Sequence, residues 1–351
     1  MTFRELDRVV VHENPHAYSS WPDITILKDG DWIIAFSQAM SRHQVTHRDP
    51  TFHNLLVRST DQGRTWSRFP QGLPGYGFFG IDCIAVTELS SGDLLAHTVL
   101  DDFVTADAAE RVGKCARYQR REPFPWAFRR IGSYVIRSVD GGYTWQEPVL
   151  VDVSPFSTGF SPRAIVELGD GTLLLPQSEE HYDPPQAFVV RSRDGGRKWG
   201  DVSLVARDEH VGFWEPAYLA LPSGKIIAML RTHEEGDYHL YQCDSYDAGY
   251  TWTQPVRTPM WGYPAHMLTL QDGRVLCAYG RRRPPFGIRA CLSGDDGQSW
   301  DIDDELVIRD DFPNSDLGYP TSVQLADGTI FTTYYGQDDG VTCIHGSFYS
   351  I

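Results

Sequence analysis

Cysteine is scarce in this sequence, and no two cysteines form a CxxC pair. The six that occur are scattered along the chain, at Cys83, Cys115, Cys243, Cys277, Cys291 and Cys343. This spacing excludes a zinc ribbon and offers no disulfide framework, so we expect reduced core thiols in a cytoplasmic protein. No stretch approaches the roughly 18 apolar residues of a membrane span. Residues 1–11 also lack the basic and then apolar pattern of a signal peptide.

Basic residues are in deficit, with 31 Lys and Arg against 47 Asp and Glu and a formal net charge of -16. That balance argues against nucleic acid or an anionic membrane as a partner. An anionic substrate stays open if a local cluster of arginines overrides the overall field. The 12 histidines show no paired ligand spacing, so we predict neither a metal nor another cofactor.

Aromatic residues are plentiful, and one aromatic-ended octad is repeated. The pattern S-x-D-x-G-x-[TSK]-W occurs five times, with its aspartate at Asp61, Asp140, Asp194, Asp247 and Asp295. The Asp carboxylate can accept backbone N–H bonds, the Gly tolerates positive φ, and the Trp can pack against a sheet. Each copy therefore predicts a hairpin turn of the same design.

A second repeat lies between the octads. Each unit has an apolar strand, a turn containing glycine and another apolar strand, with the turns at Gly30, Gly92, Gly171, Gly224, Gly273 and Gly328. Alternating apolar and polar residues, as in Val323-Gln324-Leu325, favour strands over helices. Six such units of four strands each predict an all-β, six-bladed β-propeller.

Five octads in six units indicate how the ring closes. The octad joins the third and fourth strands of a unit, and the last unit lacks one. We therefore expect the N-terminal strand, residues 3–12, to complete the last blade beside the strand that ends near Ile351, which leaves no exposed edge. The longer spacing in the second unit predicts a rim insertion at about residues 98–131 within a single domain, 1–351.

The octads resemble the Asp boxes of the sialidase (neuraminidase) superfamily, and the resemblance covers essentially the whole chain. It implies a sialidase-type propeller in which the Asp boxes are structural. Function must then be argued from the opposite end of the blades, where the inner strands begin. Those segments are rich in polar residues, which are costly to bury unless they pair or bind something. Asp82 and His266 stand at two such starts and are predicted to bind substrate in a central pocket. The equal alternative for His266 is a structural histidine.

Three residues match the catalytic set that the resemblance implies. Tyr319, in GYPTSVQLADG, resembles the sialidase nucleophile, and Glu215, in FWEPAYLA, resembles the glutamate that assists it. A phenol, with a pKa of about 10, needs such a base nearby. Asp49 lies in the loop where sialidases carry their acid/base aspartate. His43, which is also a candidate for substrate binding, and His47 are alternative proton donors. Glu215, Tyr319 and Asp49 each have a structural alternative. Glu215 could form only a salt bridge, Tyr319 could be a stacked ring, and Asp49 could cap a turn.

The resemblance also implies arginines that hold a substrate carboxylate. Arg231 matches one of them, and Arg282, within Arg281–Arg283, matches another. Ser20 stands where the family has its first arginine, and Arg163 is the candidate replacement. One missing guanidinium–carboxylate bond is worth roughly 1.5–3 kcal/mol, so sialic acid, a uronic acid and another sugar all stay open as substrates.

The leading hypothesis is a sialidase-like exo-glycosidase that hydrolyses a terminal acidic or highly hydroxylated sugar. Sialidases are the known tyrosine-nucleophile exception among glycosidases. The alternatives are a polysaccharide lyase that acts on uronates through Tyr and His, and a glycan-binding propeller without catalysis. Trp21 and Trp214 could stack on a sugar face under all three.

Overall fold

The computed structural model describes residues 3–44, 46–74, 79–112, 118–120, 122–179, 183–233 and 237–351, without the side chains of residues 79–82. Almost all regular structure in these ranges is β-strand. The single described helix, α1 (Ala106–Val112), is too short to cross a membrane.

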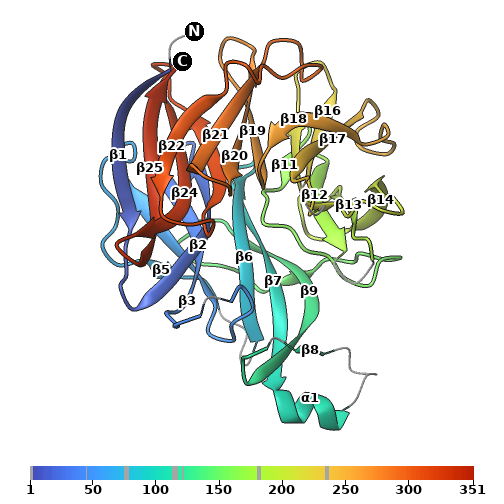
Figure 1. The fold of residues 1–351 in the computed structure, drawn as a ribbon. Coiled ribbons are helices and arrows are strands. Elements are labelled where there is room, and N and C mark those ends of the chain that lie inside the picture. Colours follow the sequence, from blue (N-terminus) through green and yellow to red (C-terminus); the bar gives the residue numbers. More distant parts are fainter. Residues whose placement is uncertain are drawn as a thin grey trace.

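The strands of the described residues form five hydrogen-bonded sheets. Figure 1 shows their arrangement. One sheet contains β2 (Ala17–Ile26), β3 (Trp32–Met40), β4 (His53–Ser59), β5 (Gln71–Gly72), β23 (Gly318–Gln324), β24 (Ile330–Asp338), β25 (Val341–Ser350) and β1 (Arg4–His12). The second contains β6 (Phe79–Glu88), β7 (Leu94–Thr105), β8 (Gln119–Arg120), β9 (Trp126–Ser138) and β10 (Val149–Leu150).

The other three sheets are four-stranded antiparallel meanders. They contain β11 (Val166–Glu167), β12 (Leu173–Glu179), β13 (Gln186–Ser192) and β14 (Gly200–Ala206); β15 (Trp214–Ala220), β16 (Ile226–Arg231), β17 (His239–Ser245) and β18 (Val256–Trp261); and β19 (Ala265–Thr269), β20 (Val275–Arg281), β21 (Phe286–Ser293) and β22 (Leu306–Phe312).

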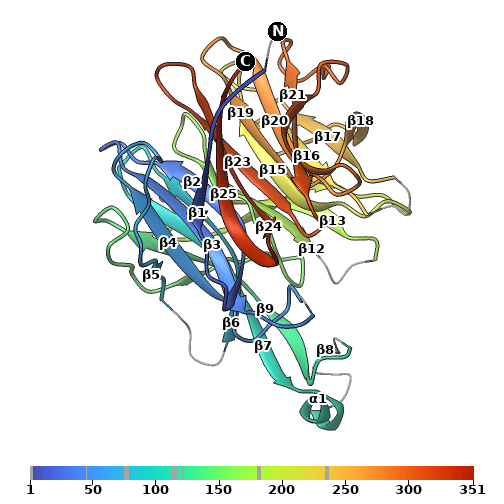
Figure 2. The same ribbon diagram turned by 60° about the vertical axis from the view of Figure 1, so that its left-hand side comes forward.

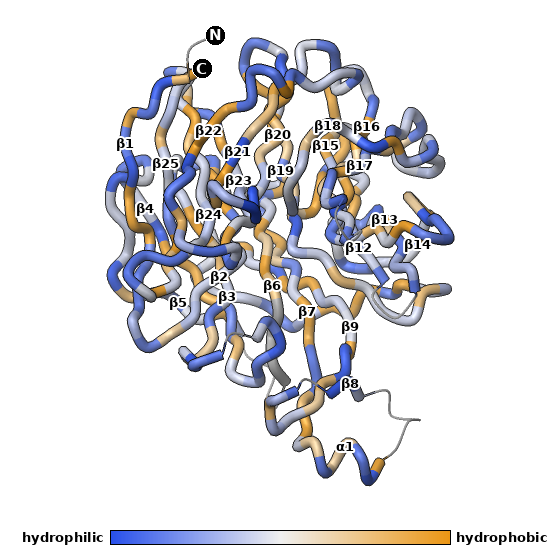
Figure 3. The backbone as a smooth tube through the Cα atoms, viewed as in Figure 1, coloured by the Kyte–Doolittle hydropathy of each residue, from blue (hydrophilic) through white to orange (hydrophobic). Residues whose placement is uncertain are grey.

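The sheets pack face to face as an all-β propeller, because their middle strands are apolar on both faces. Along β3, Trp32, Ile34 and Phe36 pack in a cluster with β24 and β25, whereas Ile33 and Ala35 face β6 and β7. This is the period of two expected for a strand that is buried on both sides. Figure 3 shows the hydrophobic segments following the strands at the centre of the view.

The N-terminal strand pairs with the C-terminal one, as the missing octad predicted. β1 runs antiparallel to β25 (Figure 2). β25 meets β2 through one parallel bridge between Tyr18 and Thr342. That bridge merges the first and last groups of strands into one eight-stranded sheet. Hydrogen bonding therefore gives five sheets and does not by itself reproduce six separate blades.

Both predicted turn types are present. In the first octad, Asp61 accepts hydrogen bonds from the backbone N–H (2.8 Å) and hydroxyl (2.6 Å) of Thr65, and Ser59 Oγ accepts from the N–H of Gly63. The other four octads repeat these contacts in their main features. In each of the six glycine turns, the glycine N–H donates to the carbonyl of a leucine three residues earlier, as Gly30 does to Leu27.

The described residues of the predicted insertion include the outer part of a long hairpin. β7 and β9 pair along their length from Leu94 opposite Ser138 to Thr105 opposite Trp126, and α1 follows β7 at the tip. Both ribbon views show this hairpin projecting from the end of the molecule farthest from β1 and β25 (Figures 1 and 2).

Gly63 tests how tightly the octad turn is packed. Its φ is +78°, and a Cβ there would stand 2.7 Å from Cζ3 of the buried Trp32. Gly30 has a similar φ of +95°, but a Cβ there would meet nothing within 4 Å. We predict that Gly30→Ala lowers the free energy of unfolding by about 1–2 kcal/mol, the cost of a left-handed alanine. Gly63→Ala should cost a further 1–3 kcal/mol, roughly, from overpacking.

Urea denaturation of the two variants measures both costs. Equal losses of stability would mean that the Trp32 ring moves aside freely and that octad packing is not what restricts this position.

Candidate functional site

Four residues near the starts of inner strands have left-handed backbones although none is glycine. Trp21 (φ 54°), Cys83 (54°), Glu215 (42°) and Tyr319 (51°) each lie in a bulge where the inner strand shifts register against its neighbour. Such conformations cost roughly 1–3 kcal/mol each and persist only where the surroundings impose them. The same strained feature recurs in four groups of strands. Trp21 and Glu215 both lie against Tyr319.

Tyr319, Glu215 and Arg231 form one buried hydrogen-bonded set. The Tyr319 hydroxyl donates to Glu215 Oε1 at 2.5 Å, and Arg231 Nη1 donates to Glu215 Oε2 at 2.6 Å. Arg231 Nη1 also lies 3.0 Å from the Tyr319 oxygen. The three side chains come from β23, β15 and β16. The Glu215–Arg231 salt bridge, the structural alternative for Glu215, therefore coexists with the Glu215–Tyr319 contact that the catalytic interpretation requires.

The protonation of this set follows from its surroundings. Burial alone would raise the pKa of Glu215, but the charge of Arg231 and the bonds from Tyr319 and Arg231 hold that pKa below its usual value. Burial, together with the negative charge of Glu215, raises the pKa of Tyr319 well above its usual value, although Arg231 and Arg282 oppose this. The resting site thus holds an ionised carboxylate that accepts a hydrogen bond from a neutral phenol.

Two further arginines lie against Tyr319. The Arg282 guanidinium is 5.7 Å from the centre of the Tyr319 ring, and that of Arg163 is 5.8 Å from it. Within the described residues neither forms an ion pair with a carboxylate. Arg163 is 3% exposed and donates from Nη1 to the carbonyl of Pro320. Of the predicted Arg281–Arg283 run, Arg283 points elsewhere and stacks on Trp261.

The structure does not bring Asp49 into this set. Its carboxylate is 2% exposed, is ion-paired with Arg42 and accepts two hydrogen bonds from Thr51, at 2.7 and 2.9 Å. Burial would raise the pKa of Asp49, but these bonds hold it below its usual value. A carboxylate held in this way is the ionised form and not a proton donor. Its acid/base role stays a prediction that the geometry does not favour.

The remaining predicted residues lie in three places. His43 is exposed in the loop before β4, and no contact joins it to Tyr319 among the described residues. His266 lies near Arg163 and accepts the backbone N–H of Ser322 at Nδ1; burial and Arg163 lower its pKa to about 3. The side chain of Asp82 is outside the described residues, as are residues 180–182. Ser20 is fully buried, and its hydroxyl has no partner in the described part of the chain.

A polar cluster that the sequence did not predict as a unit adjoins Tyr319. Asp316 Oδ1 accepts hydrogen bonds from Tyr18 and Tyr335, both at 3.0 Å, and lies 3.5 Å from His47 Nε2. The Tyr335 ring is 6.0 Å from that of Tyr319. Of these residues, the sequence indicates a role in proton transfer only for His47. The sequence feature that could have indicated Asp316 is its position three residues before Tyr319.

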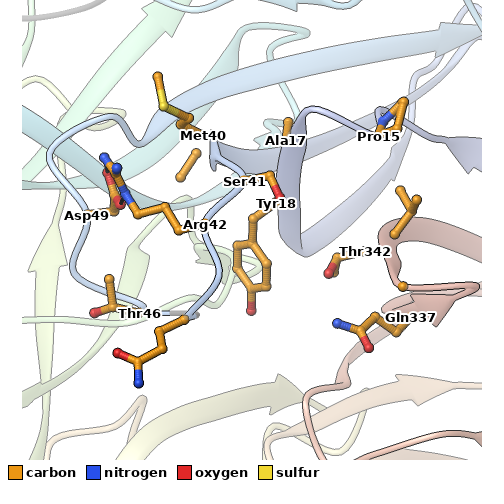
Figure 4. A pocket seen from close by; sticks show the side chains of 14 residues that line it. Pro15, Ala17, Tyr18, Met40, Ser41, Arg42, Thr46, Asp49, Gln337 and Thr342 are labelled. Atoms are coloured by element: carbon orange, nitrogen blue, oxygen red, sulfur yellow. Dashed lines mark hydrogen bonds and ion pairs between the residues drawn. The ribbon is translucent and has the colours of Figure 1, made fainter.

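A small cavity of about 60 Å³ opens beside this cluster. Tyr18, Arg42, Thr46, Asp49 and Gln337 contribute to its lining. Figure 4 shows Arg42 and Asp49 together on one side, with the ring of Tyr18 between them and Gln337. A cavity needs roughly 10–15 Å³ of such volume to hold one water molecule, so this one has room for several.

The chain matches known families and proteins along most of its length. Residues 119–332 match the BNR repeat-like domain family, and residues 57–68 match the BNR/Asp-box repeat. A sialidase from Bacteroides fragilis (strain YCH46) is 25% identical over 206 residues, which cover 57% of this chain but only 37% of that protein. The chain therefore matches well under half the length of this relative.

Solved structures extend the likeness to the whole chain. A Dyadobacter fermentans protein of unknown function has 29% sequence identity and a TM-score of 0.91, with 99% of each chain covered. The NanB sialidase of Streptococcus pneumoniae has 13% identity and a TM-score of 0.69, over 97% of this chain and 70% of that one. At that identity the second likeness supports the fold alone.

Asp23 lies in β2, two residues after the strained Trp21, and its burial makes the stability of the fold depend on pH. It is 4% exposed, and its Oδ2 accepts the N–H of Val86 at 2.9 Å. Burial raises its pKa from 3.8 to about 7, against the opposing effects of that bond and of Arg163. The folded state therefore keeps a proton that the unfolded state releases, so stability from this group is present at low pH and is lost between about pH 4 and pH 7.

We predict that Asp23→Asn, which cannot ionise, removes this loss. The difference in free energy of unfolding between variant and wild type should grow by about 2–4 kcal/mol from pH 4 to pH 7.5 in favour of the variant. Urea titrations at several pH values measure it. A difference that stays constant with pH would show that Asp23 is already ionised in the folded protein at low pH.

Proposed function

The chain belongs to the BNR repeat-like domain family of the sialidase superfamily, and on that premise we propose that it is a sialidase-like exo-glycosidase that hydrolyses a terminal acidic sugar. The observation that carries the proposal is the buried Tyr319–Glu215–Arg231 set. A phenol that donates to a carboxylate at 2.5 Å is a nucleophile with its base in place.

Each member of the set has a role in this chemistry. The Tyr319 oxygen bonds to the anomeric carbon as the glycosidic bond breaks, and the phenol proton passes to Glu215. The leaving oxygen takes a proton from a donor in the site. Water then attacks the anomeric carbon as the bond to the Tyr319 oxygen breaks. One proton of the water goes back to that donor, and Tyr319 recovers its own proton from Glu215. Arg231 keeps Glu215 ionised and faces the charge that develops on the Tyr319 oxygen.

Arginines without counter-ions support an acidic substrate. Arg231 is neutralised by Glu215, but Arg282 and Arg163 have no carboxylate partner in the described part of the chain. Asp316 lies near Arg282, but three guanidinium groups against the carboxylates of Glu215 and Asp316 still leave an excess of positive charge. In a largely buried site that excess favours an anion, whatever the overall charge of -16. We assign carboxylate binding to Arg282 together with Arg231. Arg163 is nearly closed to solvent, and we propose that it supports the Tyr319 ring.

We also infer that the propeller has six blades in one domain. Within the described residues, six buried apolar clusters alternate with six groups of strands around the ring. The cluster of Trp32, Phe36, Phe331 and Phe348 separates the first and last groups, so the eight-stranded sheet divides into two blades that share one parallel bridge. The β7–β9 hairpin is then a rim extension of the second blade.

We predict that Tyr319→Phe lowers turnover of an aryl α-sialoside or an aryl β-glucuronide at least 1,000-fold, because no oxygen is left to attack the anomeric carbon. Glu215→Gln should lower it by about 100-fold or more through loss of the base. Release of the aryl alcohol measures turnover, and circular dichroism shows whether each variant is folded.

Three results would contradict this assignment in different ways. Full activity of Tyr319→Phe would exclude the nucleophile. A product that absorbs in the ultraviolet as an unsaturated uronate would identify a lyase, and saturable binding without any product would identify a glycan-binding protein.

Arg282 provides a separate test of the acidic substrate. We predict that Arg282→Gln weakens binding of free N-acetylneuraminic acid or glucuronic acid by about 10- to 100-fold, as expected for one lost charged hydrogen-bond pair. Arg283→Gln, which removes the neighbouring guanidinium from Trp261, is the matched control. Isothermal titration calorimetry measures both. Equal effects of the two changes would mean that Arg282 acts only through the general field.

A further inference from the structure

His47 is held beside the nucleophile by two neighbours. Its Nε2 is 2.9 Å from the Tyr18 hydroxyl and 3.5 Å from Asp316 Oδ1. The ring lies edge-on to Trp21 at 5.2 Å, and Trp21 in turn lies 6.2 Å from the Tyr319 ring. Only one aromatic ring therefore separates His47 from the proposed nucleophile. Its side chain is 38% exposed, so it can meet a substrate that enters from solvent.

The two nitrogens of His47 have different surroundings. Nε2 faces Asp316 and Tyr18, whereas Nδ1 has no hydrogen-bond partner among the described residues. A carboxylate on one nitrogen fixes the orientation of the ring and leaves the other nitrogen to exchange a proton. Asp316 is itself fixed by Tyr18 and Tyr335, and Arg282 adds a positive charge near it.

The loop that carries His47 is held in place by the hairpin extension. The Trp126 indole N–H donates to the carbonyl of Arg48 at 2.8 Å, and Arg42 stacks on the Trp126 ring at 5.0 Å. On the inner side, Phe52 stacks on Trp21 at 5.0 Å. The extension thus gives a long loop fixed contacts at both ends of its histidine segment. Precise placement is what proton transfer requires.

We propose that His47, oriented by Asp316, is the proton-transfer residue of this site in place of Asp49. This inference rests on the proposed function. As Tyr319 bonds to the anomeric carbon, the imidazolium of His47 gives its Nδ1 proton to the leaving oxygen. In the second half, neutral His47 takes a proton from the attacking water and is restored. Asp316 is a positioning residue, and Asp49, locked to Arg42 and Thr51, shapes the loop.

Leaving-group dependence tests this role. An aryl glycoside needs little help from a proton donor because its phenolate leaves readily, whereas a methyl glycoside needs the donor. We expect His47→Gln to lower kcat/KM on the methyl glycoside at least 100-fold and on the 4-methylumbelliferyl glycoside of the same sugar less than about 10-fold. Asp316→Asn should show the same asymmetry to a smaller degree. His16→Gln, which removes an exposed imidazole, is the matched control and should leave both rates unchanged.

Each outcome separates this inference from the proposed function. If the wild type hydrolyses both glycosides and His47→Gln lowers the two rates equally, or lowers neither rate, His47 is not the proton donor. The proposed function then still stands. If Asp49→Asn instead shows the asymmetry, the donor is Asp49 and the inference is overturned. If the wild type hydrolyses no sialoside or glucuronide, the proposed function fails and this inference fails with it.

Discussion

The buried ion pair between Arg231 and Glu215 is the interaction on which the rest of the site depends. A carboxylate that is 5% exposed would normally hold a proton, because burial disfavours its charge. The guanidinium at 2.6 Å reverses that preference, so Glu215 stays ionised and accepts the hydroxyl of Tyr319. Removing either partner would leave a charge buried without compensation, which costs far more than the pair contributes. The stability of the fold and the proposed chemistry therefore both require this ion pair.

The propeller meets that demand by fixing backbone strain where blades converge. Trp21, Glu215 and Tyr319 have left-handed φ, each precedes a proline, and each lies in a bulge. The flanking strands are buried on both faces, and their clusters hold the bulges in place from either side. Strain that a loop would relax is retained here, and it turns three side chains towards one point. Rigid strands thus give a precision that a mobile loop could not.

Local and distant contacts differ in how far the sequence reveals them. The octads were predictable because their hydrogen bonds join residues at most four apart, as between Asp61 and Thr65. The propeller followed from the repetition of such units. Tyr319 and Glu215 are 104 residues apart, and only resemblance to a family pointed to their meeting.

Nothing in the sequence pairs Tyr18 with Asp316, which are 298 residues apart, and the lock on Asp49 depends on how one loop folds. The five hydrogen-bonded sheets have the same origin, because the Tyr18–Thr342 bridge depends on how closely the first and last groups of strands approach. Contacts of this kind are set by the closure of the ring and not by any segment alone.

The surroundings of Ser20 explain why this position, where the family resemblance implies an arginine, can hold a serine. Ser20 is fully buried, and the next residue, Trp21, presents its ring to Phe52, His47 and Tyr319. The position that resembles an arginine site is therefore bordered by aromatic rings, and Trp21 is itself only 3% exposed. The guanidinium of Arg282 lies 5.7 Å from the centre of the Tyr319 ring. Under the proposed function Arg282 holds the anionic group of the substrate, a requirement that uronic acids meet as readily as sialic acid.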